Sequence, residues 1–232
     1  NKVVDYAVDN QIDVLFVQVR GRGSVFYKSQ FEEFESPDID FDPLAYIIKK
    51  CENTNVKIHA WFNLYLVWSQ KKKPVSPKHP LNRFPDAILK DTGFQAYSEK
   101  MSKTVEGHYL SPFHPKVNSY LMEMVQELII NYPVDGIHFD YVRYPNSDFI
   151  VEQKLLDYAS NKLGFSPLLL KKYPDSAAAL NGKMENMENY KKIQNLYGRI
   201  IGEFLNKVYF WVNNNYPKLL ISAAVKPDPA LA

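Results

Sequence analysis

The stretch VDGIHFDYVRYP, residues 134–145, decides the fold of this chain. It alternates as a β-strand does, because successive strand side chains point to opposite faces of a sheet. Its apolar members are Ile137, Phe139 and Tyr141, and its other members are Gly136, His138 and Asp140. The apolar face is suited to packing on helices. The opposite face therefore carries an imidazole and a carboxylate, where a central strand usually carries valine or isoleucine.

Asp140 lies near the end of this predicted strand. The carboxyl ends of parallel strands are where α/β enzymes place their reacting groups. A carboxylate buried there costs several kcal/mol unless it is paired or hydrogen-bonded. We therefore predict that Asp140 is a functional acid. The alternative is a structural acid bonded to Arg143 or Arg20.

Three other segments have the pattern of strands in the same sheet. Residues 12–20 are apolar nearly throughout, as strands of parallel sheets are, and residues 56–63 and 219–225 follow later in the chain. Alternation places several chemically active side chains on one face of the first two: Gln18 and Arg20, then His59, Trp61 and Asn63.

Helical patterns separate these strands. Asp42 is the expected N-cap of one helix because Pro43 follows it at the first helical position. Residues 64–114 form a long connection, rich in proline and lysine, which we expect to fold over a site. Further helices are predicted at residues 1–10, 115–132, 148–163, 166–173 and 185–214.

The order of strands and helices predicts an α/β fold with a parallel sheet. Only about four strands are predicted, whereas a complete (β/α)8 barrel has eight and typically uses about 250 residues. An open doubly wound sheet and a fragment of a barrel both fit this pattern.

Composition excludes some functions. The 232 residues carry a net charge of +2, so a nucleic acid or an anionic membrane is not indicated as a partner, and no apolar run is long enough to span a membrane. The 16 Tyr, 14 Phe and 3 Trp suit a core and also a sugar cleft. Cys51 stands alone, so no internal disulfide forms. No glycine-rich phosphate loop, nucleophile elbow or metal-ligand spacing is present, so we predict no cofactor and no metal site.

Six stretches, in this order, resemble the glycosyl-hydrolase-like 10 family, whose members are bacterial (β/α)8-barrel proteins of the cell envelope. At least some members cleave the glycan strands of peptidoglycan. The stretches are VQVRGRG (17–23), FDPLAYII (41–48), HAWFNLYLVWS (59–69), YLSPFHPKV (109–117), VDGIHFDYVRYP (134–145) and ISAAVKPDP (221–229). The family commonly has an acid after the second glycine of the VQVRGRG stretch, where this chain has Ser24.

The resemblance implies a TIM (β/α)8-barrel-like fold, of which this sequence holds about the second to fifth strands. Residues 1–232 would form one glycoside-hydrolase-like domain, with a helical insertion at residues 146–215. It also implies a location in the cell envelope or outside the cell, and a glycan substrate, with peptidoglycan strands as the leading expectation. No oligomeric state is predicted.

Glycoside hydrolysis normally needs two carboxyl groups, about 5–5.5 Å apart in retaining enzymes and about 6.5–9.5 Å apart in inverting ones. We assign Asp140 as one catalytic residue and Glu106, in the long connection, as the other. Asp228, or an acid on a strand outside this sequence, is an alternative to Glu106.

Eight residues are predicted to bind the substrate. Arg20 is expected to hold an anionic group such as the lactyl carboxylate of a muramic sugar, unless it forms an ion pair within the protein. Trp61 is expected to stack on a sugar ring, and Asn63 to bond a hydroxyl. The full set is Gln18, Arg20, His59, Trp61, Asn63, His138, Arg143 and Tyr144.

Two other functions fit the same residues. One is a noncatalytic carbohydrate-binding barrel that uses the same aromatic cleft, and the other is a sugar-processing enzyme on an unrelated open α/β sheet. A second carboxylate at one of the two spacings from Asp140 favours hydrolysis, and its absence favours binding.

Overall fold

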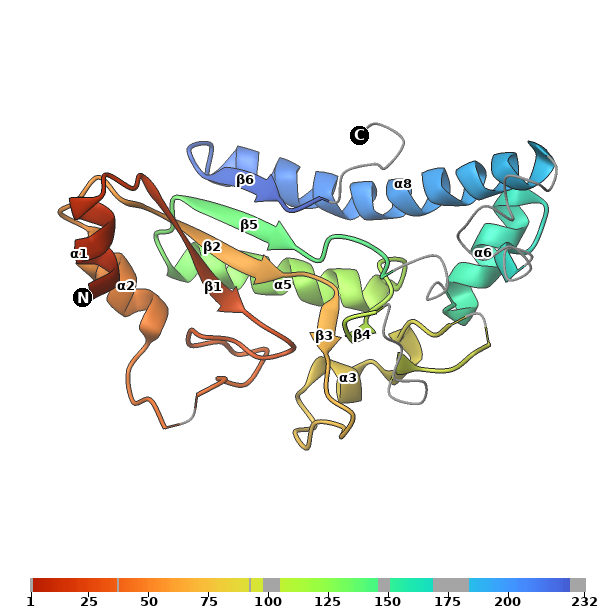
Figure 1. Cartoon of the computed structure of the whole chain (residues 1–232), viewed down its shortest axis with the longest axis horizontal. Helices are drawn as coiled ribbons and strands as arrows, with labels where there is room; N and C mark the ends of the chain where they lie inside the picture. The colour runs from red at the N-terminus through yellow and green to blue at the C-terminus, as the bar shows by residue number, and fades with distance from the viewer. Residues whose placement is uncertain are drawn as a thin grey trace.

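A computed structural model describes residues 2–36, 38–91, 93–97, 105–145, 151–168 and 184–225. Its centre is a sheet of four parallel strands in the order β1-β2-β5-β6 (Figure 1). The strands are β1 (Val14–Arg20), β2 (Lys57–Asn63), β5 (Gly136–Asp140) and β6 (Leu220–Ala223). The prediction of an α/β fold with a parallel sheet is therefore confirmed.

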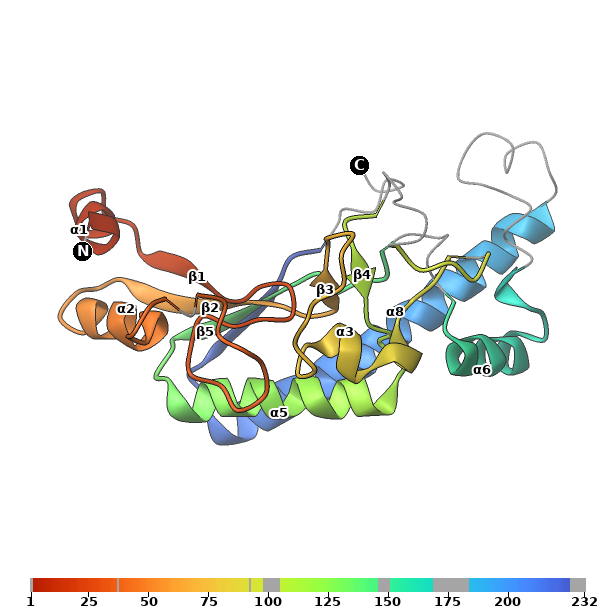
Figure 2. The same cartoon turned by 90° about the horizontal axis from the view of Figure 1, so that it is seen from below.

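Helices cover one face of this sheet. Seen from below, α5 (Pro115–Asn131) and α8 (Met184–Asn215) lie on the same side of the strands (Figure 2). The strand side chains that face them are fully buried or nearly so, and so is the apolar stripe of α5. The buried set includes Ile58, Ala60, Phe62, Ile137 and Phe139 from the sheet and Val117, Leu121, Met124, Val125 and Leu128 from α5.

The predicted helix starts at Pro43 and Pro115 are confirmed, whereas the helix predicted at residues 148–163 begins at Gln153 in the described part of the chain. The side chain of Asp42 accepts a hydrogen bond from the Ala45 backbone N–H at 3.0 Å, and Pro43 opens α2 (Pro43–Cys51). Two further helices are α1 (Lys2–Asp9) and α6 (Gln153–Leu163). Most of the helix predicted at residues 166–173 lies outside the described residues. No described helix combines the length and apolarity that a bilayer crossing requires.

On the opposite face of the sheet, the strand register places the side chains of neighbouring strands in rows. Asn63 lies beside Asp140, and Trp61 lies beside His138. On the other side of β2, Gln18 pairs with Trp61 and Phe16 with His59. Phe16 is 52% exposed, so this face of the sheet is open among the described residues.

Arg20 does not share this face, contrary to the prediction from alternation. The register shifts between Gln18 and Arg20, so that Arg20 pairs with Phe62 although Gln18 pairs with Trp61. One extra residue in a strand turns the next side chain to the other face. Arg20 therefore points to the side of the sheet that the helices cover.

The long connection after β2 is folded, as expected, beside the carboxyl ends of the strands (Figure 1). It contains the antiparallel pair β3 (Leu66–Trp68) and β4 (His108–Tyr109), helix α3 (Pro80–Arg83) and the short 3-10 helix η1 (Pro85–Ala87). Its side chains Leu64, Tyr65 and Leu110 are fully buried, so it packs as part of the same core.

Candidate active site

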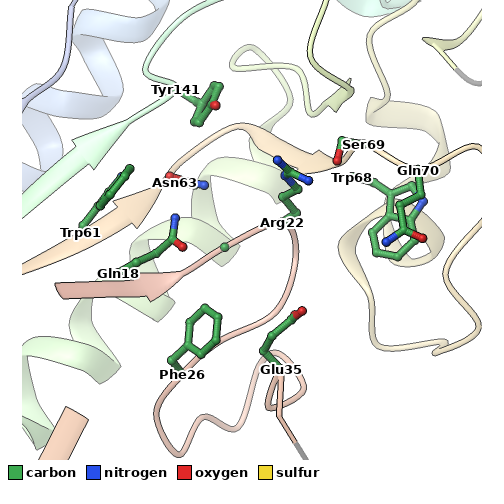
Figure 3. Close-up of a pocket in the computed structure, with 11 residues that line it drawn as sticks. Gln18, Arg22, Phe26, Glu35, Trp61, Asn63, Trp68, Ser69, Gln70 and Tyr141 are labelled. Atoms are coloured by element: carbon green, nitrogen blue, oxygen red, sulfur yellow. The ribbon is translucent and has the colours of Figure 1, made fainter. Parts of the chain in front are cut away.

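A pocket of about 400 Å³ lies at the carboxyl ends of β1, β2 and β5. Its floor comes from the strands, and its walls come from the turn after β1 and from the segment after β3 (Figure 3). The described residues that line it are Gln18, Gly21, Arg22, Phe26, Glu35, Trp61, Asn63, Trp68, Ser69, Gln70 and Tyr141.

Three of the predicted substrate-binding residues form the floor of this pocket: Gln18, Trp61 and Asn63. The Nε1 of Trp61 and the Oδ1 of Asn63 are buried and have no hydrogen-bond partner within the part of the chain that the structure describes. Buried polar atoms are nearly always paired in folded proteins. The floor of the pocket therefore contains a donor and an acceptor that are both covered and unpaired, and a polar ligand such as a sugar could satisfy them only if these side chains shift.

Asp140 lies at the edge of this pocket. Its neighbours Asn63, in the adjacent strand, and Tyr141, next in the chain, both line the cavity. The side chain is half-buried, and its Oδ1 accepts a hydrogen bond from the Tyr141 backbone N–H at 2.7 Å. The two arginines considered as structural partners form ion pairs with other acids, so neither supports the structural alternative.

Arg20 is one of these two, and the structure contradicts its predicted role in binding substrate. Its side chain is fully buried and contacts Glu32, with Nη2 and Oε1 2.5 Å apart. It also donates from Nη1 to the carbonyl oxygens of Asn63 and Leu64. Burial alone would lower the pKa of Arg20, but the Glu32 carboxylate raises it above the ordinary value. Arg20 thus joins β1, β2 and the turn after β1.

Glu106 and Arg143 were predicted as a catalytic acid and a substrate ligand, but they bind each other. The Nη2 of Arg143 lies 2.6 Å from the Oε1 of Glu106, and the hydroxyl of Tyr109 donates to Oε2 at 3.0 Å. Partial burial opposes ionisation, but hydrogen bonds from its own backbone N–H and from Arg143 hold the pKa of Glu106 below its usual range. A carboxyl group held ionised is poorly suited to act as a general acid.

Three other predicted residues lie away from the pocket. Tyr144 packs against Tyr197 of α8, with ring centroids 4.6 Å apart, and its hydroxyl is buried, so the structure does not support its predicted role in binding substrate. His59 and His138 lie deeper on the open face, where the ring of Phe16 contacts both. Nδ1 of His138 lies 2.9 Å from the hydroxyl of Ser222. These two histidines therefore lie below the pocket and pack with Phe16.

Several lining residues were missed by the sequence reasoning because they come from loops. Arg22 extends from the turn after β1 into the pocket, and Glu35 approaches from the return of the same loop (Figure 3). The hydroxyl of Ser24 donates a hydrogen bond to Glu35. Glu35 is the carboxylate among the described lining residues. Asp228, the other acid considered from the sequence, lies outside the described residues.

The turn that carries Arg22 is held by His79. Nε2 of His79 lies 3.0 Å from the Arg22 carbonyl oxygen, and Nδ1 accepts from the Leu81 backbone N–H at 3.1 Å. Because Nδ1 must accept, Nε2 carries the proton and donates. Gly23, with φ of +82°, lies against the same ring.

We expect the substitution Gly23→Ala to lower the free energy of unfolding by more than about 2 kcal/mol. A left-handed backbone costs a residue with a Cβ about 1–2 kcal/mol, and a Cβ at Gly23 would lie 2.4 Å from Nε2 of His79. Gly164→Ala is the matched control, because Gly164 has φ of +75° and open space around it. Denaturant unfolding of both variants measures the difference. Equal losses of stability would contradict the proposed clash between a Cβ at Gly23 and the ring of His79.

Stability is expected to fall as the pH is lowered below about 6.5. Burial lowers the pKa of both His59 and His79 from the ordinary value of 6.5. Below that value the unfolded chain binds protons that the folded chain does not, so the contribution is complete above pH 6.5 and is lost as the pH falls. Unfolding free energies measured across this range should fall less steeply for His79→Gln than for the wild type. Equal slopes would contradict this assignment.

The described residues contain no group of three or more His, Cys, Asp and Glu side chains placed to hold a metal ion.

A family model described as glycosyl hydrolase-like 10 matches residues 1–161 of the chain. The chain belongs to this family. Two curated relatives carry related names. The chain is 24% identical over 153 residues to glycosyl hydrolase YngK of Bacillus subtilis, a match that covers 62% of this chain and 28% of the relative. It is 26% identical over 148 residues to glycosyl hydrolase DigH of Escherichia coli K12, covering 59% of this chain and 32% of the relative.

Solved structures of glycoside hydrolases share the fold of this family member. An α-L-fucosidase from Paenibacillus thiaminolyticus matches with a TM-score of 0.66 and 16% identity, over 95% of this chain and 28% of the fucosidase. The PgaB glycoside hydrolase domain of Bordetella bronchiseptica matches with a TM-score of 0.66 and 14% identity, over 97% of this chain and 58% of that domain. At such low identity these likenesses show the fold alone. The chain spans about three tenths of the length of both curated relatives.

Proposed function

We propose that this family member is part of a glycosidase that hydrolyses a bacterial cell-wall or related glycan, with peptidoglycan strands as the preferred substrate. One observation carries the proposal: Asp140 ends β5 at the edge of a pocket that is lined by several aromatic rings and by two residues, Trp61 and Asn63, that each hold a covered polar atom without a partner in the described chain. The predicted location in the cell envelope or outside the cell is part of the same proposal.

The proposed carboxyl pair is Asp140 with Glu35, in place of the Glu106 assignment. Glu35 belongs to a pocket wall, whereas Glu106 is held by Arg143 and Tyr109. Hydrolysis breaks the bond between the anomeric carbon and the leaving oxygen, and a water oxygen takes its place. One carboxyl group gives a proton to the leaving oxygen, while the other activates the water or attacks the carbon first.

The proposed preference for peptidoglycan strands rests on Arg22. Its guanidinium enters the pocket that Arg20 does not reach, and guanidinium groups bind carboxylates through paired hydrogen bonds. The role expected of Arg20, to hold the lactyl carboxylate of a muramic sugar, is therefore proposed for Arg22. Trp61, Trp68 and Tyr141 supply aromatic surfaces on which sugar rings pack.

The sheet is proposed to be the part of a TIM barrel that holds its second to fifth strands. In such a barrel the face of Phe16, Trp61 and His138 is the interior, which layers of side chains fill. The half-exposed ring of Phe16 supports this placement, because a phenylalanine in that row would be covered inside a closed barrel.

The test uses the full-length protein with purified peptidoglycan glycan strands and, separately, with a neutral chitin oligosaccharide. We expect new reducing ends from the first substrate and far fewer from the second. Arg22→Gln should raise KM for the charged strands, while Arg22→Lys keeps part of the effect, because a lysine retains the charge but not the paired hydrogen bonds. Cleavage of neither substrate would overturn the proposed activity. Equal KM values for wild type and Arg22→Gln would overturn the role of Arg22.

A noncatalytic carbohydrate-binding protein is the second candidate. The observation in its favour is that Glu106, the acid first assigned as the partner of Asp140, is engaged in an ion pair. Retention of the glycan strands without product, by both the wild type and Asp140→Asn, would favour binding over hydrolysis.

A further inference from the structure

Tyr141, the residue that follows Asp140, has an unusual backbone. Its φ of +54° lies in the left-handed region, which is unfavourable for a residue with a large side chain. Such strain persists only where the surrounding contacts hold it, and it is concentrated at functional sites. Contacts around Tyr141 must therefore hold its backbone in this conformation.

The ring of Tyr141 is held between two neighbours. It meets the ring of Tyr109 edge to face, with centroids 6.1 Å apart, and the guanidinium of Arg143 lies 5.3 Å from its centroid. The same guanidinium lies 5.7 Å from the Tyr109 centroid, so Arg143 covers both rings. A cation over an aromatic face is attracted by the ring quadrupole.

Glu106 fixes both neighbours at once. One of its oxygens binds Nη2 of Arg143 at 2.6 Å, and the other accepts from the Tyr109 hydroxyl at 3.0 Å. Arg143 also donates from Nη1 to the Pro145 carbonyl oxygen at 3.1 Å. The carboxylate of Glu106 therefore determines where the cation and the ring sit, although it does not line the pocket.

The far end of this chain of contacts is Asp140. The backbone N–H of Tyr141 donates to Oδ1 of Asp140 at 2.7 Å, and the carbonyl oxygen of Asp140 accepts from the Leu64 backbone N–H at 2.8 Å. This N–H lies in the peptide plane that joins Asp140 to Tyr141, and the left-handed turn at Tyr141 follows that plane directly. A shift in the Tyr141 backbone would therefore turn the carboxylate of Asp140.

We propose that Glu106 is a positioning residue for Asp140, acting through Arg143, Tyr109 and the strained backbone of Tyr141. This inference rests on the proposed function, because it takes Asp140 as a reacting group. Glu106 keeps a role in the chemistry, but as the support of the catalytic carboxylate instead of its partner across the glycosidic bond. Small misplacements of a reacting group are enough to slow an enzyme on the order of 10²-fold.

Glu106→Gln tests the inference because it keeps the shape of the side chain and removes its charge. We expect kcat on peptidoglycan strands to fall about tenfold or more with KM nearly unchanged. Arg143→Met should have a similar effect, and the double variant should lose little more than the larger single loss, because both residues act through the same contacts.

The matched control is Glu188→Gln. Glu188 forms an ion pair with Lys192 on the surface of α8, at 2.8 Å, far along the chain from the pocket residues. It should leave kcat unchanged. Thermal unfolding of each variant separates misplacement from unfolding, since a positioning role predicts a loss of kcat in protein that is still folded.

The outcomes separate this inference from the function on which it rests. If the wild type cleaves the strands and Asp140→Asn does not, but Glu106→Gln keeps the full kcat, the inference is wrong and the function stands. A loss of kcat in the double variant equal to the product of the two single losses would also contradict the inference. If the wild type cleaves nothing, both proposals fail.

Discussion

Asp140→Asn is expected to lower kcat on glycan strands by about 10²–10⁴-fold, the range that a single acid–base group contributes. The amide keeps the size of the side chain, and its oxygen can still accept the hydrogen bond from the Tyr141 backbone N–H. It can neither give nor take the proton that hydrolysis requires. Reducing ends released from purified strands by the full-length protein measure the loss.

Asp135→Asn is the matched control for that experiment. Asp135 precedes the same strand at its opposite end, where its Oδ2 accepts from the Ile58 backbone N–H at 2.9 Å. The control should therefore keep kcat, because the change lies at the other end of β5. A variant with asparagine at position 140 that still cleaves the strands at the wild-type rate would remove Asp140 from the mechanism.

Arg20→Met is expected to give the largest loss of stability, about 3–5 kcal/mol, as when one partner of a buried ion pair is removed. The change would leave the Glu32 carboxylate buried, with the Tyr120 hydroxyl as its remaining hydrogen-bond partner among the residues that the structure describes. It would also leave the carbonyl oxygens of Asn63 and Leu64 without the donor that Arg20 supplies. Urea unfolding of the purified variant measures the loss.

A control variant and a double variant test this explanation of the loss. Lys57→Met removes an exposed ion pair with Asp135, at 3.2 Å, and should cost no more than about 1 kcal/mol. Combining Arg20→Met with Glu32→Gln should recover part of the loss, since no unpaired buried charge then remains. A loss at Arg20 no greater than that at Lys57 would show that the buried pair contributes little.

Much of the fold could be predicted from the sequence, because it depends on local patterns. Alternation in VDGIHFDYVRYP and in the earlier strands identified β5, β1 and β2, and the Asp42–Pro43 pair marked the start of α2. Parallel pairing then follows from the alternation of strands and helices. Since the side chains of a parallel sheet line up in rows, Asn63 was also expected on the same face as Asp140, and the register places them side by side.

The pocket walls could not be predicted in the same way, because they come from loops that meet only in the folded chain. Arg22 and Glu35 are thirteen residues apart and have no periodic pattern that marks them as neighbours, yet both line the cavity with Trp68. Glu106 and Arg143 are 37 residues apart in sequence, and their ion pair gives Glu106 a different role from the one its position in the long connection suggested.

The sequence by itself determined the type and order of the central strands and helices and the face on which Asp140 lies, because side-chain alternation and helix capping act between near neighbours. The tertiary structure alone decided which charged groups reach the pocket. A one-residue shift in β1 turned Arg20 into the core, where Glu32 compensates its charge, and left Arg22 to enter the cavity. Such a shift is set by the packing of β1 against its partner strand and the loop around it, which no local pattern of residues records.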